Sequence, residues 1–239
     1  MKTSGPIERL VAASLFALVL VLAVAQRAQS ETWKIASPEW PPYAGADLPD
    51  NGRAIDRLRT VLQRAGITLE VDFMPWSRAK AVAASSDYIG YFPAWPGDVD
   101  DQFVVTDPVD VSRLAIIRRV ETTLETSCID GLFENYRVGF VAGHVYPAQI
   151  QRLIYQHYQP EDGSEDEEDL VRVLAAGRID AALSDPAVLL HLAEKLHLNG
   201  IDPVVDILEK RPLVLALSRT GGYMQRLERL NKLLRARAN

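Results

Sequence analysis

The sequence predicts an α/β fold, because short apolar runs typical of strands alternate with segments of helical periodicity along the chain. The 239 residues are 48% hydrophobic and 24% charged, the composition of an ordinary folded protein. The formal net charge of -6 argues against a nucleic-acid binder, which usually shows a basic footprint. The single cysteine, Cys128, excludes an internal disulfide framework and a zinc site built on paired cysteines.

The N-terminus has the pattern of a secretory signal peptide. Lys2 and Arg9 precede an apolar run over 10–25, and the small residues at 28–30 fit a cleavage site. The alternative is an uncleaved anchor helix, but the run is shorter than the roughly 20 residues that span a bilayer. We therefore expect residues 1–30 to be removed and the rest to be a soluble protein exported to the periplasm.

The first half of the mature chain alternates strands and helices. The segment 53–65 places Ile55, Leu58 and Leu62 on one face and stops at Gly66, which predicts a helix. The expected strands are 33–36, 68–73, 88–92 and 114–120, and the expected helices are 53–65 and 78–84.

The second half continues the alternation. Asp185 followed by Pro186 is an N-cap with proline at the first helical position. The closing segment carries Leu227 and Leu230 on one face, as an amphipathic helix does. The expected strands are 136–141, 179–183, 204–208 and 213–217, and the expected helices are 148–158, 169–176, 186–196 and 223–237.

The run Glu161 to Asp169 is mostly acidic. One interpretation is a cation site. The other is a solvated loop that leads into the acidic first turn of a helix, where the helix dipole favours negative charge. The second is favoured, because no spacing fixes ligand geometry as in an EF-hand.

Aromatic residues gather between Trp33 and Phe103, and several lie in loops beside prolines. Proline fixes the backbone, so such rings are often presented toward a cleft. Trp40, Tyr43, Trp76 and Trp95 are therefore candidate ligand contacts, and the alternative is that they cover the edges of the fold.

No catalytic or metal-binding constellation is visible. The four histidines are scattered, and HExxH, GxSxG, GxGxxG and Walker-type motifs do not occur. A lone cysteine such as Cys128 is more often packed than catalytic. The residues predict a protein that is not an enzyme and that uses no cofactor or metal.

Several motifs, in order, resemble the extracellular solute-binding proteins of family 3, the periplasmic receptors of polar amino-acid ABC transporters. They are EWPPY at 39–43, MPWSRA at 74–79, DGL at 130–132, YRVG at 136–139 and GRIDAALSD at 177–185. The resemblance covers most of residues 32–237.

The resemblance implies a two-lobed periplasmic binding protein type II fold, with ligand held between the lobes and hinge closure favoured by ligand contacts. It divides the mature chain into 31–115 in lobe 1, 116–209 in lobe 2 and 210–239 returning to lobe 1 with the C-terminal helix. It also implies a monomer that captures a small polar solute and delivers it to an ABC permease in the inner membrane.

The resemblance also implies roles for single residues. Trp40 and Tyr43 would form one wall of the cleft. Asp185 matches an acidic residue that accepts the ammonium group of an amino acid, although its oxygens could equally cap the helix that begins at Pro186. The loop 143–147, with His144 and Tyr146, would present N–H groups to an anionic group of the ligand.

The sequence departs from the family where an arginine would bind the carboxylate of the ligand. The stretch 95–102 has three acids and no arginine. Arg78 and Arg113 are possible substitutes, or solvated surface residues. An acidic cleft instead favours a cationic ligand, to which Trp40, Tyr43 and Trp95 would add cation–π attraction.

Two other function classes stay open. Relatives of the family include periplasmic dehydratases, in which Asp185 would be the general acid. A ligand sensor without a transport role is the other, since fold alone is a poor guide to function.

Overall fold

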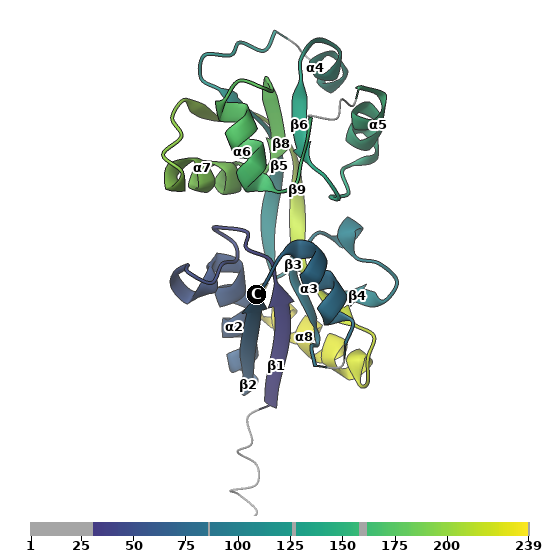
Figure 1. Cartoon of the computed structure of the whole chain (residues 1–239). Helices are drawn as coiled ribbons and strands as arrows, with labels where there is room; N and C mark the ends of the chain where they lie inside the picture. Colours follow the sequence, from purple (N-terminus) through teal and green to yellow (C-terminus); the bar gives the residue numbers. More distant parts are fainter. Residues whose placement is uncertain (1–30, 86, 126–127, 158–161, 239) are drawn as a thin grey trace, which may run out of the picture.

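A computed structural model describes residues 31–85, 87–125, 128–157 and 162–238, without the side chains of 202–207, 237 and 238. The predicted signal peptide, residues 1–30, lies outside the described residues, as do Tyr158 at the end of the predicted helix and Glu161 of the acidic run. The described chain forms two groups of α/β elements, one above the other in Figure 1, which we call the lower and upper lobes. No described helix is both long and apolar enough to cross a membrane.

The lower lobe is built around parallel strands. β1 pairs with β2 over its whole length and with β3 on its other side. Helix α2 forms here because its apolar residues Ile55, Leu58 and Leu62 share one face and are fully buried in the same cluster as β1. The elements are β1 (Glu31–Ser37), η2 (Pro49–Asn51), α2 (Arg53–Gln63), β2 (Ile67–Phe73), α3 (Trp76–Ala83), β3 (Gly90–Ala94), η3 (Pro96–Asp98), β4 (Phe103–Val105) and α8 (Tyr223–Ala238).

The upper lobe repeats the plan with a short parallel set. β6 lies between β7 and β8, with both pairs parallel. Its core holds the apolar faces of the helices, among them Leu170 and Leu189. The elements are α4 (Ile129–Asn135), β6 (Val138–Val141), α5 (Ala148–His157), β7 (Gly163–Ser164), α6 (Glu167–Ala175), β8 (Ala181–Ser184) and α7 (Pro186–Lys195).

Two antiparallel strands, β5 (Asp110–Arg119) and β9 (Ile201–Ser218), join the lobes and are visible between them in Figure 1. β9 pairs with β3 and β4 in the lower lobe, and β5 pairs with β8 in the upper lobe. The chain then ends in α8, whose Leu230 and Leu234 pack in the same cluster as α2. The connection between the lobes is therefore two-stranded.

The structure confirms most of the predicted elements and corrects three points. The strands 204–208 and 213–217 are one strand, because the residue before Pro212 keeps an extended backbone and Arg211 continues the ladder opposite Ser112. The short elements η2, η3, β4, β7 and α4 were not predicted. Cys128 is exposed at the N-cap of α4, where its sulfur accepts from Gly131 N at 3.4 Å, so the prediction that it is packed is wrong.

Candidate functional site

A cavity of about 690 Å³ lies between the lobes. The lower lobe contributes the loop after β1, the start of α3 and the segment after β3, and the upper lobe contributes the segment after β6 and the start of α6. The residues that carry its chemistry are Glu39, Trp40, Trp76, Trp95, Asp98, His144, Glu165, Asp166 and Glu167. The site thus draws on both lobes, as a ligand cleft that closes must.

Three tryptophan rings, Trp40, Trp76 and Trp95, give the cavity an aromatic wall. Trp40 and Trp95 meet edge to face, with their ring centroids 5.9 Å apart and their planes at 83°. Trp95 is fixed by a hydrogen bond of 2.8 Å from its indole nitrogen to Ser112 Oγ on β5. Trp40 and Trp95 lie beside prolines outside the helices, and Trp76 follows Pro75 as the first residue of α3.

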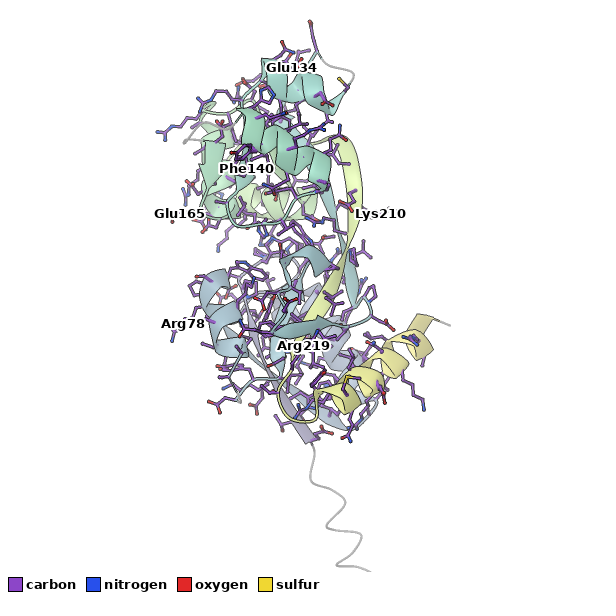
Figure 2. All side chains as sticks on the ribbon, turned by 90° about the vertical axis from the view of Figure 1, so that its right-hand side faces the viewer. Arg78, Glu134, Phe140, Glu165, Lys210 and Arg219 are labelled. Atoms are coloured by element: carbon purple, nitrogen blue, oxygen red, sulfur yellow. The ribbon has the colours of Figure 1, made fainter. Side chains whose placement is uncertain are left out.

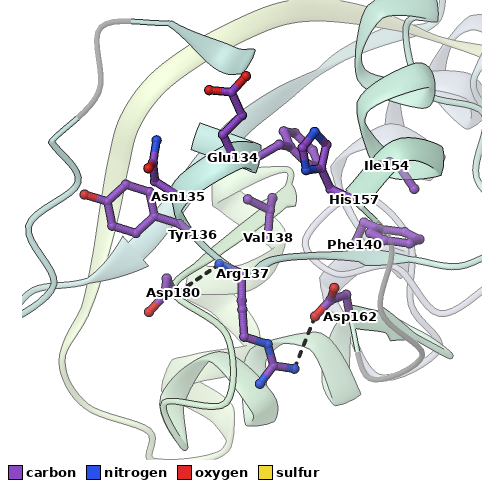
Figure 3. A pocket seen from close by; sticks show the side chains of 11 residues that line it. Glu134, Asn135, Tyr136, Arg137, Val138, Phe140, Ile154, His157, Asp162 and Asp180 are labelled. Atoms are coloured by element: carbon purple, nitrogen blue, oxygen red, sulfur yellow. Dashed lines mark hydrogen bonds and ion pairs between the residues drawn. The ribbon is translucent and has the colours of Figure 1, made fainter. Parts of the chain in front are cut away.

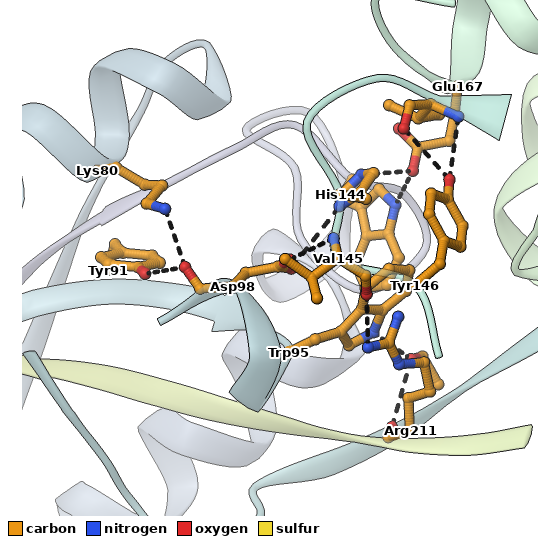
Figure 4. A network of polar contacts seen from close by, with 12 residues as sticks. Lys80, Tyr91, Trp95, Asp98, His144, Val145, Tyr146, Glu167 and Arg211 are labelled. Carbon is orange, nitrogen blue, oxygen red and sulfur yellow. Dashed lines mark hydrogen bonds and ion pairs between the residues drawn. The ribbon is translucent and has the colours of Figure 1, made fainter. Parts of the chain in front are cut away.

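His144 projects from the loop after β6 into the centre of this wall. Its ring centroid lies 4.9 Å from that of Trp95 and 6.2 Å from that of Trp76. Its Nδ1 is 3.7 Å from Asp98 Oδ2, and its Nε2 is 3.7 Å from Glu167 Oε1 (Figure 4). Burial alone would lower the pKa of His144, but the two carboxylates raise it to about 9. His144 therefore carries a positive charge at neutral pH.

Asp98 connects the lower lobe to the upper loop. The short helix η3 places its carboxylate, which is 7% exposed, so that Oδ1 accepts from Val145 N at 2.9 Å. Its backbone oxygen accepts from Lys80 Nζ at 2.9 Å, which holds η3 against α3. The N–H of Val145 lies in the loop that the resemblance assigned to an anionic ligand group, and here the protein supplies the carboxylate itself.

Glu167, the first residue of α6, makes a second link between the lobes. Its Oε1 accepts from the indole nitrogen of Trp40 at 2.8 Å, and its side chain is 12% exposed. Asp166 caps α6 by accepting from Asp169 N at 2.8 Å, as the helix-start interpretation predicts. The prediction of a merely solvated run is wrong for Glu167. Among the residues that the structure describes, no cluster of acidic, histidine or cysteine side chains is arranged to hold a metal ion.

Arg211 on β9 supports the site from the connecting strands. Its guanidinium lies 3.9 Å from the ring centroid of Trp95 and donates to Val145 O at 2.9 Å. Burial lowers the pKa of Arg211, while Asp98 opposes this shift. Neither Arg211 nor Glu167 was singled out from the sequence.

Asp185 and Tyr43 are hydrogen-bonded to each other and are not among the residues that line the cavity. Asp185 Oδ2 accepts from Tyr43 Oη at 2.7 Å and from Arg113 N at 2.6 Å, while Oδ1 accepts from Ala187 N at 2.8 Å. The capping role of Asp185 is confirmed. The role as ammonium acceptor stays a prediction; in this conformation Asp185 is 1% exposed and its oxygens already have protein partners.

The structure thus separates the eight candidate ligand contacts into two sets. Trp40, Trp76, Trp95 and His144 line the cavity. The other four are Tyr43, Arg78, Tyr146 and Asp185, which are not among its lining residues.

Arg78 and Tyr146, and the alternative arginine Arg113, also contact solvent or the protein and not the cavity. Arg78 is exposed on α3 and points outward, as Figure 2 shows. The hydroxyl of Tyr146 accepts from Val141 N at 3.0 Å and donates to Val141 O at 3.3 Å, so it holds its own loop. Arg113 is exposed, and only its backbone N–H reaches Asp185.

A second cavity, of about 270 Å³, lies within the upper lobe (Figure 3). It is bordered by α4, β6 and the end of α5, with the ion pair between Arg137 and Asp162 at its rim. None of the residues predicted as ligand contacts lines it.

Comparison with known proteins identifies the fold. No protein-family profile and no curated protein matches the sequence. Many solved structures do match. One is a histidine kinase sensor domain with similarity to periplasmic binding proteins, with a TM-score of 0.69 at 18% identity over 86% of this chain and 89% of that one. The chain has the two-lobed fold of the periplasmic binding proteins.

Two further solved structures share this fold. An ancestral arginine-binding protein bound to arginine has a TM-score of 0.67 at 18% identity, over 87% of this chain and 92% of that one. An ancestral amino acid-binding protein, a precursor of cyclohexadienyl dehydratase, has a TM-score of 0.63 at 16% identity, over 90% and 92%. The fold class predicted from the sequence is confirmed, and similar structures include binding proteins, a sensor domain and the precursor of an enzyme.

Proposed function

We propose that this protein is a periplasmic receptor that binds a small organic cation in the cavity between its lobes. The observation that carries the proposal is the charge of the cavity. Among the described residues that line it, five are carboxylates and His144 is the one cationic side chain. Trp40, Trp76 and Trp95 add aromatic faces, which attract cations.

The groups that would bind the ammonium and carboxylate of an α-amino acid already contact other parts of the protein, which favours a ligand that is not such a zwitterion. The acceptor for the ammonium group, Asp185, is occupied by Tyr43, and the loop N–H of Val145 is occupied by Asp98. Neither Arg78, which is exposed on α3, nor Arg211, whose guanidinium packs on Trp95 and donates to Val145 O, is among the residues that line the cavity. A ligand recognised mainly by its positive group fits these remaining contacts.

Ligand capture would work by closure of two lobes. We propose boundaries near residues 115 and 210, where β5 leaves the lower lobe and β9 returns to it. A ligand that touches Trp95 from below and Glu167 from above contacts both lobes only when they are closed, and it therefore shifts the population toward the closed state.

A thermal-shift screen with matched ligands tests this function. Agmatine and arginine carry the same guanidinium, but agmatine lacks the carboxylate. We expect agmatine to raise the melting temperature, arginine to raise it less, and glutamate to have no effect. A ligand at 100 times its Kd adds about 2.7 kcal/mol of stability. Stabilisation by glutamate alone, or by none of a broad set of cations, would contradict the proposal.

Two neighbouring glutamates provide a matched pair of variants for that screen. Glu167→Gln removes a charge from the cavity but keeps an oxygen that can accept from Trp40. Glu168→Gln removes the same charge one residue later, where the side chain pairs with Arg172 and does not line the cavity. Calorimetry should show weaker binding of the cation for the first variant and unchanged binding for the second.

We further propose that the protein acts as a monomer that binds without chemical conversion and passes its ligand to an ABC permease. A sensor role is the competing possibility, because a sensor domain shares the fold. Deleting the gene separates them: uptake of the labelled ligand falls if the protein serves transport, and only a transcriptional response is lost if it serves sensing. Recovery of the ligand unchanged after incubation tests the absence of catalysis.

A further inference from the structure

His144 occupies a position that a bound cation would fill. Its ring packs against Trp95 at 4.9 Å between centroids, and its two nitrogens face one carboxylate from each lobe, Asp98 and Glu167. These are the partners of an organic cation with two N–H groups: an aromatic surface and two charged acceptors.

The fit of His144 to this position is loose. Both nitrogen–oxygen distances are 3.7 Å, longer than a hydrogen bond. Nδ1 is buried and has no hydrogen-bond partner among the described residues. An N–H group carried on a ligand could approach either carboxylate more closely, because a free molecule is not constrained by the loop backbone.

The backbone on either side of His144 is placed independently of its ring. Gly143 has a φ of 83°, a left-handed conformation that glycine adopts without strain, and a Cβ there would meet nothing within 4 Å. Meanwhile Val145 is held at both its N–H, by Asp98, and its carbonyl, by Arg211. A rotation of the His144 side chain about its own bonds would leave these two contacts of Val145 in place.

We propose that Trp95, Asp98 and Glu167 form a cation subsite that the His144 side chain fills in the absence of ligand, and that the bound cation displaces this ring. This inference rests on the proposed function for the identity of the cavity, and it adds where the positive group binds and what it must replace. Affinity is then set by competition between the ligand and a cation that belongs to the protein.

Other groups near the His144 ring affect the same competition. Its own loop contributes Val145 and Tyr146, which are neutral. The cavity wall contributes the carboxylates of Glu39, Glu165 and Asp166, and β9 contributes the guanidinium of Arg211. Lys80 reaches the backbone of Asp98 from α3. Carboxylates outnumber cations in this set, so an empty subsite would carry net negative charge.

Removing the ring tests the proposal with a small probe. His144→Ala should open the subsite to imidazole at pH 6, where the probe is mainly imidazolium. We expect calorimetry to give an affinity at least about tenfold higher than in the unmodified protein, equivalent to roughly 1.4 kcal/mol. Pyrazole, a neutral ring of the same size, should not bind. Equal affinity in the two proteins, or equal binding of pyrazole, would overturn the proposal.

Charge-removing variants locate the subsite. Adding Asp98→Asn to His144→Ala should lower the imidazolium affinity about tenfold, because one of two facing charges is lost while an oxygen for Val145 N remains. Adding Glu168→Gln should leave it unchanged. If Asp98→Asn leaves the affinity unchanged, or if Glu168→Gln lowers it equally, the probe binds elsewhere and the assignment is wrong.

A measurement on the intact protein applies even if His144→Ala does not fold. Proton NMR should show the His144 ring titrating near pH 9, and Asp98→Asn and Glu167→Gln should each lower that pKa. A ring that titrates in the ordinary range for histidine, unaffected by either variant, would overturn the subsite.

The outcomes separate this proposal from the function on which it rests. If the unmodified protein binds agmatine but His144→Ala does not bind imidazolium, the receptor function stands and the subsite fails. If His144→Ala binds imidazolium but no solute stabilises the unmodified protein, the subsite stands and the function fails. If both proposals hold, the agmatine affinity of the unmodified protein should rise relative to that of His144→Ala as the pH passes 9, because the titration of the ligand's own amine is common to the two proteins.

Discussion

At the scale of single residues, the cavity owes its chemistry to pairs that are remote in the sequence. The pKa of His144 is raised by Asp98 and Glu167, which come from different lobes. Asp185 is held by a tyrosine 142 residues away. Buried polar groups need such partners, because leaving one unsatisfied costs more than the bond itself contributes. Each of these pairs therefore links local chemistry to the relative position of the lobes.

The charge of His144 should make stability depend on pH. Its pKa is raised from the ordinary 6.5 to about 9 on folding. Its contribution is therefore fully present below about pH 6.5 and is lost as the pH rises through about 9, up to on the order of 3 kcal/mol. Urea unfolding of the protein and of His144→Gln should differ at pH 6 and converge near pH 10. A difference that is the same at both values would contradict this.

Tyr43 offers a test of the buried pair with Asp185. Tyr43→Phe keeps the ring that stacks on Trp40 and removes the hydroxyl that donates to Asp185. We expect the free energy of unfolding to fall by about 1–3 kcal/mol, because a buried carboxylate loses a donor. Tyr155→Phe is the control, since Tyr155 is 87% exposed. Equal effects of the two changes would show that the pair adds nothing.

At the scale of elements, local patterns decide where helices and strands form, and close contacts decide how they pair. α7 begins at Asp185 because its side chain caps the helix and Pro186 suits the first position. β9 continues through Arg211 and Pro212 into the lower lobe, where it pairs with β3. That pairing brings the backbones together at Gly90.

Gly90 should tolerate no side chain. A Cβ there would lie 2.1 Å from the carbonyl oxygen of Ala216 on β9, so Gly90→Ala must separate β3 from β9. We expect a loss of several kcal/mol or failure to fold, as overpacking at a rigid backbone contact predicts. Gly221→Ala is the control, because nothing lies within 4 Å of its Cβ. Thermal melts of both variants compare the two sites, and a Gly90→Ala melt close to that of the unmodified protein would contradict the prediction.

At the scale of the whole molecule, the lobes touch through their own side chains. Tyr43 reaches Asp185, Trp40 reaches Glu167 and Asp98 reaches Val145, in each case from the lower to the upper lobe. A two-stranded connection allows hinge motion, so these contacts are what hold this conformation.

Removing two of these contacts should open the molecule. The double variant Trp40→Phe, Tyr43→Phe deletes the indole N–H and the phenol O–H that reach the upper lobe and keeps an aromatic ring at each position. We expect small-angle X-ray scattering to give a larger radius of gyration than for the unmodified protein without ligand, and a saturating cation to restore the smaller value. An unchanged radius in the double variant would show that other contacts fix the lobes.

The site itself could be predicted only in part. Proline-flanked tryptophans indicated the aromatic wall, whereas of the acids at 98–101 only Asp98 lines the cavity. Glu167 and Arg211 were missed because nothing in their neighbours distinguishes them from a helix-start glutamate and a strand arginine. Their partners, Trp40 and Val145, are 127 and 66 residues away.

The alternation of helices and strands, the capping of α7 and the α/β class could be predicted, because they depend on periodicity and on neighbours a few residues apart. The hydrogen bond from Tyr43 to Asp185 and the position of His144 between two carboxylates became visible only in the folded chain. The reason is physical: contacts across a cavity depend on how two lobes are placed on their connecting strands, and no local pattern encodes that placement.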